Sequence, residues 1–343
     1  MSVIDRSLPP SSGPIGHFDF PSVERRRLSN GLDLRIALVP RLPVVSVRLF
    51  IRTGEAALRA DSAGLAALTG EALDGGTKKR TGRELADALE SIGARFGASA
   101  GWEGTSVSLY CLADRLEEGL TLLAEAVTQP RFPSNEVERA QEQHMAGIRQ
   151  RSMDPGSLAS DVANSRYFAD AVPYSRPLDG TLESLSSLTR TDLVGYADIN
   201  YRPGNGGLIV VGDIEPSEVV DLAEKHLGAW VGSPSSGEHF SVEPDTRERR
   251  VLVVDRPGSV QSEIRVGHVG AGRSIPDYFP LSIANMVLGG TFSSRLNLNL
   301  RERNGFTYGV RSRFAFRSQA GPFEVSTAVG TEVTAAAVEE IIR

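Results

Sequence analysis

The sequence predicts an α+β fold of two homologous domains, each an antiparallel sheet with helices packed on one face. Two observations predict it. Short alternating strands are followed by pairs of helices, which is typical of helices packed against one side of a sheet. The pattern of residues 34–49 then returns at residues 250–266, a spacing of roughly 216 residues. Solenoid repeats have periods of about 20–50 residues, so two copies at this distance indicate a duplicated domain.

The first predicted elements are a hairpin, a long strand and a helix. Residues 24–39 alternate around Asn30-Gly31, and Asn-Gly between alternating strands is the strongest short hairpin signal. Residues 44–53 alternate again and predict another strand. A helix is expected near 63–74, where the pair Gly75-Gly76 ends it as a C-cap.

The rest of the first domain alternates strands and helices. A helix begins after Thr81, whose hydroxyl suits an N-cap. The short apolar run 208–212 predicts a buried strand. Further strands are expected near 94–100 and 104–112, and helices near 113–128, 134–151, 156–169, 190–200 and 215–230.

Composition changes along the chain predict the domain boundaries. Residues 1–22 contain four prolines and predict an extended N-terminal arm, followed by a first domain at 23–232. The polar, Ser-, Pro- and Glu-rich segment 233–248 predicts a linker, and a second domain spans 249–343. The second copy runs for only about 95 residues against about 210 in the first. We therefore expect a second domain that is incomplete at its C-terminus.

Composition also limits the function. The 343 residues carry a net charge of −6, with 40% hydrophobic and 23% charged residues, which is typical of a globular protein and argues against nucleic acid as a partner. Cys111 is the only cysteine, so no intramolecular disulfide can form. No apolar run approaches the ~18 residues of a membrane span, and the N-terminus lacks the apolar core of a signal peptide. These features favour a cytoplasmic protein.

Residues 64–77 read Gly-Leu-Ala-Ala-Leu-Thr-Gly-Glu-Ala-Leu-Asp-Gly-Gly-Thr and follow a long strand. This segment resembles the active-site helix of the pitrilysin/insulinase family of zinc peptidases, which includes the mitochondrial processing peptidase. In that family the helix carries His-x-x-Glu-His, and its first His lies ten residues before the Thr that corresponds to Thr77. The resemblance therefore places Ala67 at the first His, Gly70 at the catalytic Glu and Glu71 at the second His. We call these three the motif positions.

The chemistry of the motif has been lost at these positions. A catalytic zinc needs three protein ligands and an open position for water, and the motif Glu acts as general base. Ala67 and Gly70 have no ligand atoms, and the single carboxylate of Glu71 does not hold zinc. The resemblance places the family's third ligand, a Glu in a later helix, at Ala146 and Gly147, which we call the third-ligand positions. We therefore expect no metal and no other cofactor in this chain.

Residues 289–310 carry the most specific positive signal, a glycine pair followed by Ser-Ser-Arg-Leu, Leu-Arg-Glu and Tyr-Gly-Val. They resemble the second-domain signature of the same family. In its paired members, a subunit without His-x-x-Glu-His supplies an Arg and a Tyr, seven residues apart, to substrate in the partner's active site. Arg301 and Tyr308 have that spacing. The alternative is an Arg in a surface salt bridge and a Tyr at the edge of the core, but the surrounding signature favours the substrate-binding role.

The resemblance covers nearly all of residues 23–343. Pro173-Tyr174-Ser-Arg-Pro177 and the segment from Tyr201 to Asp213 match further family motifs. The five histidines are far apart, and no two have metal-ligand spacing. His144 lies near the third-ligand positions, where a surface or core-edge role is expected.

Three hypotheses remain. The first is the non-catalytic subunit of a heterodimeric zinc metallopeptidase, which closes the peptide-binding chamber and offers Arg301 and Tyr308 to peptide held at the zinc of a His-x-x-Glu-His-bearing partner subunit. The second is a purely structural or assembly protein on the same fold. The third, an independently active zinc peptidase, is disfavoured by Ala67 and Gly70.

Overall fold

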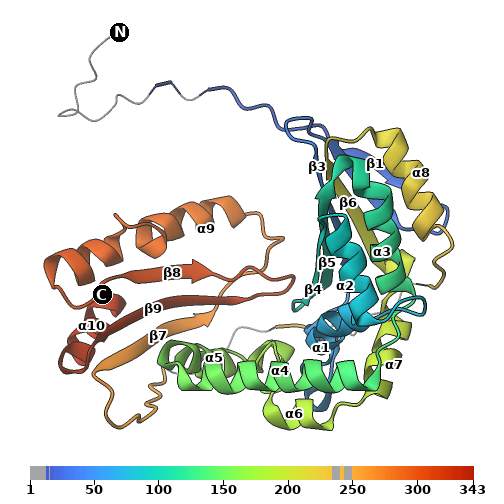
Figure 1. Ribbon diagram of the computed structural model, residues 1–343. Helices are drawn as coiled ribbons and strands as arrows, with labels where there is room; N and C mark the ends of the chain where they lie inside the picture. The colour runs from blue at the N-terminus through green and yellow to red at the C-terminus, as the bar shows by residue number, and fades with distance from the viewer. Residues whose placement is uncertain (1–12, 15, 234–239, 243–248) are drawn as a thin grey trace.

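The computed structural model describes residues 13–14, 16–233, 240–242 and 249–343. Its first half is built on a six-stranded sheet in the order β1-β2-β6-β3-β5-β4 (Figure 1). The strands are β1 (Glu24–Arg27), β2 (Asp33–Leu38), β3 (Val44–Ile51), β4 (Arg95–Ala100), β5 (Thr105–Leu112) and β6 (Gly206–Gly212). The α+β class expected from the sequence is confirmed.

The predicted hairpin forms as β1 and β2, which pair antiparallel. Gly31 has φ +89°, in the left-handed region that glycine adopts without strain. One pairing departs from the expected antiparallel pattern. β6 lies between β2 and β3, antiparallel to β3 but parallel to β2.

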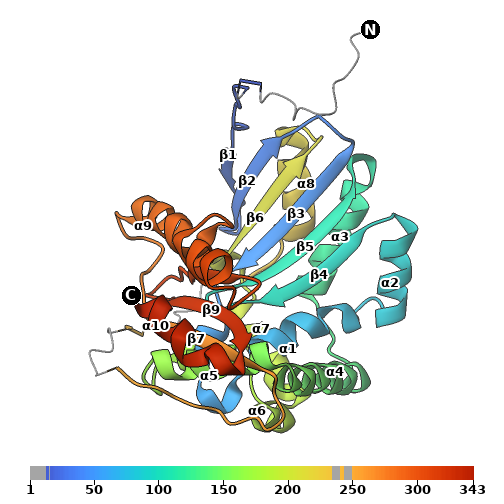
Figure 2. The same ribbon diagram turned by 90° about the vertical axis from the view of Figure 1, so that its left-hand side faces the viewer.

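Helices cover one face of this sheet and leave the other open. The covering helices are α1 (Leu65–Glu71), which continues as a 3-10 turn over Ala72–Gly75, α2 (Gly82–Ser91), α3 (Leu116–Thr128) and α8 (Pro216–Leu227). They pack on alternate, fully buried strand residues such as Val47, Leu109 and Val210. Figure 2 views the sheet from the side opposite α3 and α8. The N-cap predicted at Thr81 is present as a capping box with Glu84.

Four more helices complete the first half. They are α4 (Ser134–Met153), α5 (Pro155–Tyr167), α6 (Leu182–Ser187) and α7 (Arg190–Asn200). Both α4 and α7 pack against α1, so Leu65 to Gly70 are all buried. The short helix α6 is absent from the sequence prediction, because six residues are too few to show a helical period. The other predicted elements of this half are present, with ends shifted by a few residues.

The second half is a three-stranded antiparallel sheet in the order β7-β9-β8 with helices beside it. Its elements are β7 (Gln261–Val269), α9 (Tyr278–Asn285), β8 (Val310–Phe314), β9 (Pro322–Gly330) and α10 (Thr334–Ile342). Two π-helical segments, Met286–Gly290 and Asn297–Arg303, lie between α9 and β8. A separate small core forms around Leu300, Val310 and Val329.

The repeat predicted from residues 250–266 is only partly right. Its second part becomes β7, but residues 250–254 form no strand with any described residue. In the first half the corresponding strand β2 does not touch β3, because β6 lies between them. The sequence pattern correctly marks extended residues and cannot say which neighbour supplies their hydrogen bonds.

The two halves meet through a buried cation and aromatic rings. The guanidinium of Arg317, from the β8–β9 loop, lies 4.2 Å from the ring centre of Tyr174 and 4.8 Å from that of Trp102. Burial lowers the pKa of Arg317 to about 10. Glu103 accepts hydrogen bonds from the Tyr174 hydroxyl and from the backbone N–H of Ser318.

The proposed domain boundaries stay a prediction. Of the N-terminal arm and the linker at 233–248, most residues lie outside the described part of the chain. Among the described residues, no helix has the length and apolar character needed to cross a membrane.

Candidate functional site

The motif positions lie on α1, between the sheet and α4. Ala67 and Gly70 are buried, whereas Glu71 faces outward with 46% of its side chain exposed. A Cβ placed on Gly70 would make ordinary contacts at 3.8 Å, and one on Gly147 would meet nothing within 4 Å. A Cβ therefore fits at both places, so close backbone packing does not require glycine at either one.

Glu71 is bound by a histidine that the sequence did not mark as important. The His144 Nδ1 lies 2.9 Å from Glu71 Oε2, and its Nε2 lies 2.8 Å from the carbonyl oxygen of Asp179. Both partners only accept hydrogen bonds when Glu71 is ionised, so both ring nitrogens donate and the ring is an imidazolium. The hydrogen bond that His144 donates to Glu71 raises the pKa of His144, although burial of the ring opposes the shift.

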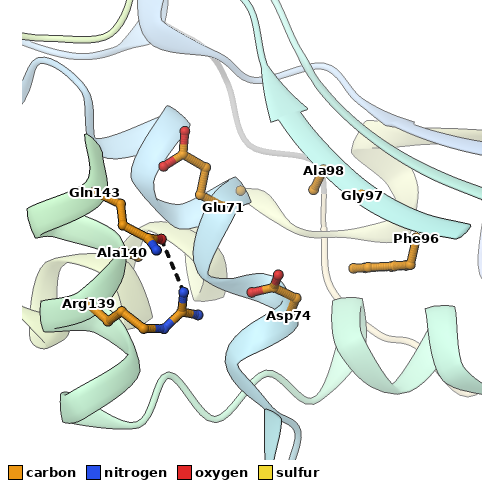
Figure 3. A pocket seen from close by; sticks show the side chains of 9 residues that line it. Glu71, Asp74, Phe96, Gly97, Ala98, Arg139, Ala140 and Gln143 are labelled. Carbon is orange, nitrogen blue, oxygen red and sulfur yellow. Dashed lines mark hydrogen bonds between the residues drawn. The ribbon is translucent and has the colours of Figure 1, made fainter. Parts of the chain in front are cut away.

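A pocket of about 260 Å³ opens beside this pair (Figure 3). Its walls come from the end of α1, from α4 and from the edge strand β4. Desolvation raises the pKa of Asp74, and the nearby Arg139 partly offsets this rise. In Figure 3, Arg139 donates a hydrogen bond to Gln143, four residues further along α4. The lining residues are Gly70, Glu71, Asp74, Phe96, Gly97, Ala98, Arg139, Ala140 and Gln143.

A buried carboxylate holds the N-terminus of α1. Glu55 is fully buried and accepts hydrogen bonds from the backbone N–H groups of Gly64 (3.0 Å) and Ala67 (3.1 Å). A negative charge here is stabilised by the unpaired N–H groups at the start of a helix. Burial raises the pKa of Glu55, against these hydrogen bonds. Arg176, from the motif Pro173-Tyr174-Ser-Arg-Pro177, donates to the carbonyl oxygens of Glu55 and Leu58.

Arg301 lies on the π-helical segment Asn297–Arg303 of the second half. Its guanidinium stacks over the ring of Phe292, 4.1 Å from the ring centre, and its Nη1 lies 3.4 Å from a Glu302 carboxylate oxygen. About a third of the side chain is exposed, at 31%. Within the described part of the chain, Arg301 therefore stacks on the ring of Phe292, which is 71% exposed, and has one ionic partner, Glu302.

Tyr308 is 95% exposed and lies in the loop that follows this segment. The loop itself is well held. The Thr307 hydroxyl and the Gly309 backbone contact each other at 2.9–3.1 Å, and Thr327 of β9 contacts both. The Asn297 side chain donates a hydrogen bond to the carbonyl oxygen of Val310 and accepts one from its backbone N–H. The phenol is thus presented to solvent by a fixed backbone. The structure shows no direct contact between Arg301 and Tyr308.

Comparison with known proteins gives the family. Residues 38–172 match insulinase (peptidase family M16), and residues 187–343 match the peptidase M16 inactive domain. This chain belongs to peptidase family M16. The M16 resemblance expected from the sequence is thereby confirmed.

Among the proteins similar to this M16 chain are some named as zinc proteases, an inactive domain and a subunit of a larger complex. It is 28% identical over 306 residues to an uncharacterized zinc protease of Mycobacterium leprae, covering 89% of this chain and 68% of that protein. It is 28% identical to the crystal structure of a peptidase M16 inactive domain from Pseudomonas fluorescens, with a TM-score of 0.87 over 94% of this chain and 78% of that one. It is also 23% identical over 214 residues to the mitochondrial cytochrome b-c1 complex subunit 1 of Bos taurus, covering 62% of this chain and 44% of that protein.

The residues at the motif positions do not fit the zinc that some relatives' names imply. A catalytic zinc needs three donor side chains and a water. Ala67, Gly70 and Gly147 offer none, and the Glu71 carboxylate is already bound by an imidazolium whose two nitrogens are both occupied. This M16 chain therefore has no set of side chains at the motif positions that would hold a catalytic metal.

The contacts of three residues in this region could not be found from the sequence. Glu55 and Arg176 act on backbone atoms, and no side-chain spacing reveals such contacts. His144 lies at the core edge, one of the two places expected for it, since the residue is partly buried and 5% of its side chain is exposed. A signal for it existed, since it lies near the third-ligand positions and Glu71 needed a partner of opposite charge.

Proposed function

We propose that this chain is the non-catalytic subunit of a heterodimeric M16 zinc metallopeptidase. Its partner is a homologous subunit that carries His-x-x-Glu-His and the zinc. This chain closes the peptide-binding chamber and donates Arg301 and Tyr308 to the substrate. It carries no zinc and no other cofactor of its own. The cytoplasmic location expected from the sequence stays a prediction.

The single observation that carries the proposal is the contrast between lost ligands and an intact fold. The fold around α1 is retained, with Glu55 holding its start and α4 packed against it. Only the donor atoms are missing, and His144 neutralises the carboxylate that remains. Selection for peptide cleavage by this chain alone would have kept those donors.

The exposed Tyr308 supports the role in trans. A guanidinium and a phenol donate hydrogen bonds to a peptide carbonyl and to the oxyanion that develops on it. A tyrosine ring usually stabilises a fold by being buried, yet Tyr308 is 95% exposed on a loop whose backbone is held by hydrogen bonds. Such a side chain is available to a ligand that comes from outside the chain.

A second candidate is a structural or assembly subunit. The similarity to the bovine cytochrome b-c1 complex subunit 1 favours it, because that name describes a subunit of a larger complex. On this hypothesis the partner's zinc, if there is one, works without help from Arg301 or Tyr308.

The test is reconstitution with a homologue that carries His-x-x-Glu-His, ideally one encoded by a neighbouring gene. We expect the isolated chain to hold no stoichiometric zinc and to cleave no peptide. The mixture should form a complex and cleave faster than the partner alone. A partner whose motif Glu is replaced by Gln is the control and should be inactive in the mixture. One zinc per isolated chain with chelator-sensitive cleavage would refute the proposal, as would a partner equally active without this chain.

A further inference from the structure

The open face of the six-stranded sheet carries a row of arginines. Along each strand, alternate side chains point away from the helices, and on this face Arg25 of β1 lies opposite Arg35 of β2. Arg35 is next to Ile209 of β6, and Ile209 lies opposite Arg48 of β3. Neighbouring strands are about 4.8 Å apart, so the row from Arg25 to Arg48 spans roughly 14 Å.

Positive charge dominates this face. Arg27 and Arg52 also lie on it, and both pair with Asp33, at 2.8 Å and 3.4 Å. Asp33 is the only acidic residue among the outward-facing strand positions of β1 to β6. Within the described residues, Arg25, Arg35 and Arg48 have no ion-pair partner, although Arg35 bonds the carbonyl oxygen of Leu34.

This arrangement costs stability in the isolated chain. Like charges directly opposite each other on paired strands are destabilising, and Arg25 faces Arg35 in that way. The chain as a whole has a net charge of −6, so the basic face is a local feature and not a reflection of composition. An anionic ligand laid across the row would remove the repulsion.

The remaining side chains on this face suit a polypeptide. Ile209 separates Arg35 from Arg48, and Phe50 and Tyr110 are exposed beside Arg48, at 38% and 53%. The face therefore places apolar and aromatic side chains beside the arginines, which suits a polypeptide that carries both apolar and acidic side chains. A single-stranded nucleic acid would meet the same arginines, so the experiment below includes an oligonucleotide as a competing ligand. Figures 1 and 2 show this face turned toward the second half.

We propose that the open face formed by Arg25, Arg35 and Arg48 binds acidic, extended polypeptide segments. This names the substrate class of the proposed peptidase subunit and rests on that function in one respect, since peptide is the ligand such a subunit holds. The binding itself needs neither the partner nor its zinc. It can therefore be measured on this chain alone.

The experiment measures fluorescence anisotropy of labelled twelve-residue probes with the whole chain. One probe alternates Glu and Ser, and its match alternates Lys and Ser. A single-stranded oligonucleotide of equal charge is the third probe. The test variant combines Arg25→Ala, Arg35→Ala and Arg48→Ala. The matched control combines Arg83→Ala, Arg115→Ala and Arg149→Ala, which removes the same charge from exposed helix or turn positions.

The Glu probe should bind the wild-type chain, and the Lys probe should not. Loss of three exposed ion pairs should weaken binding of the Glu probe about tenfold, and the control variant should change it less than twofold. Binding should also weaken as salt is raised. The test variant should fold at least as stably as wild type, because it removes the repulsion between Arg25 and Arg35.

Three results would overturn the inference: equal binding of the Glu and Lys probes, an equal loss in both variants, or tighter binding of the oligonucleotide than of the Glu probe. If the test variant fails to fold, Arg48→Gln with the salt titration decides the question in the same way. The proposed function fails separately. If the complex cleaves Glu-rich and Lys-rich peptides equally, the proposed function stands and this inference is wrong. If the chain binds the Glu probe but the complex cleaves no peptide, this inference stands and the proposed function is wrong.

Discussion

The motif positions of α1 and the Tyr308 loop have opposite characters. At α1, where the resemblance places the family's metal ligands, His144 contacts Glu71 and the carbonyl oxygen of Asp179. At the loop, the hydrogen bonds hold the backbone, while the Tyr308 ring itself is left 95% exposed. In one region the charged side chain has a partner within the chain, and in the other the aromatic side chain is left to solvent.

On the proposed function, this difference separates a region that has lost its metal ligands from one that still meets a ligand. A position that no longer holds metal is free to take an ordinary structural role, and the ion pair between Glu71 and His144 has that character. A site still in use must keep its donors unsatisfied until a ligand arrives. On this comparison Arg301 and Tyr308 affect rate and His144 affects stability, and the following experiments test that division.

The largest expected effect is on turnover of the reconstituted complex. Arg301→Ala and Tyr308→Phe each remove a donor to the developing oxyanion, and loss of one such donor costs about 10²–10³ in rate. Steady-state kinetics with the partner present measures the loss. Arg303→Ala, an exposed residue on the same segment, is the control. Complexes of both mutants that form normally and cleave at the wild-type rate would favour the structural-subunit hypothesis.

The second effect is on stability alone. His144→Leu removes two hydrogen bonds of a buried cation, and we expect a loss of about 2 kcal/mol in the free energy of unfolding. Urea denaturation measures it, with the exposed His268→Gln as a control that should change little. The activity of the complex per folded molecule should stay within twofold of wild type. A hundredfold loss of activity at unchanged stability would show that the α1 region still works in catalysis.

A smaller effect is expected at the platform of Arg301. Phe292→Leu keeps an apolar surface but removes the aromatic ring under the guanidinium, and an exposed cation–π contact is worth about 0.5–1 kcal/mol. The rate of the complex should fall about two- to fivefold, mostly through looser positioning of Arg301. Combined with Arg301→Ala, the substitution should have no additional effect. Full additivity in this double-mutant cycle would mean that the two residues act independently.

The smallest effect is a pH dependence. The folded-state pKa of His144 is raised, so its bond to Glu71 contributes full stability below the ordinary imidazole pKa of about 6.5. That contribution is lost as pH rises through the raised value. The stability difference between wild type and Glu71→Gln should therefore shrink from pH 6 to pH 9. Because Glu71 is nearly half exposed, solvent screening keeps the difference below about 1 kcal/mol. A difference that grows with pH would assign it to another group.

Most of the first half could be predicted from the sequence because its signals are local. The Asn30-Gly31 turn, the Thr81 cap and the alternation in β3 each report on neighbouring residues, and each is present in the structure. The position of β6 between β2 and β3 could not be predicted, because it depends on which distant strand pairs with which. The failed strand prediction at residues 250–254 has the same cause, because an alternating pattern predicts a strand but does not identify the strand that pairs with it.

The sequence could name the residues of the candidate site, whose role stays a prediction, but it could not give their contacts. Spacing and resemblance identified Ala67, Gly70 and Glu71, and the structure places them on one helix beside α4. The partnership of Glu71 with His144 joins residues far apart in sequence and needed coordinates. The same holds for the stacking of Arg301 on Phe292, because a π-helical turn lies outside the regular helical period.

The placement of β6 also governs how this chain folds during synthesis. The central strand of the first sheet is made only after α1 to α7, so β2 and β3 exist early without their common neighbour. At about 5–20 residues per second, roughly 8–31 seconds separate the end of β3 from the start of β6 on the ribosome. During that interval β2 and β3 lack the strand that joins them in the folded sheet. We expect this half to depend on chaperones while it is made, and to be slow to refold from denaturant.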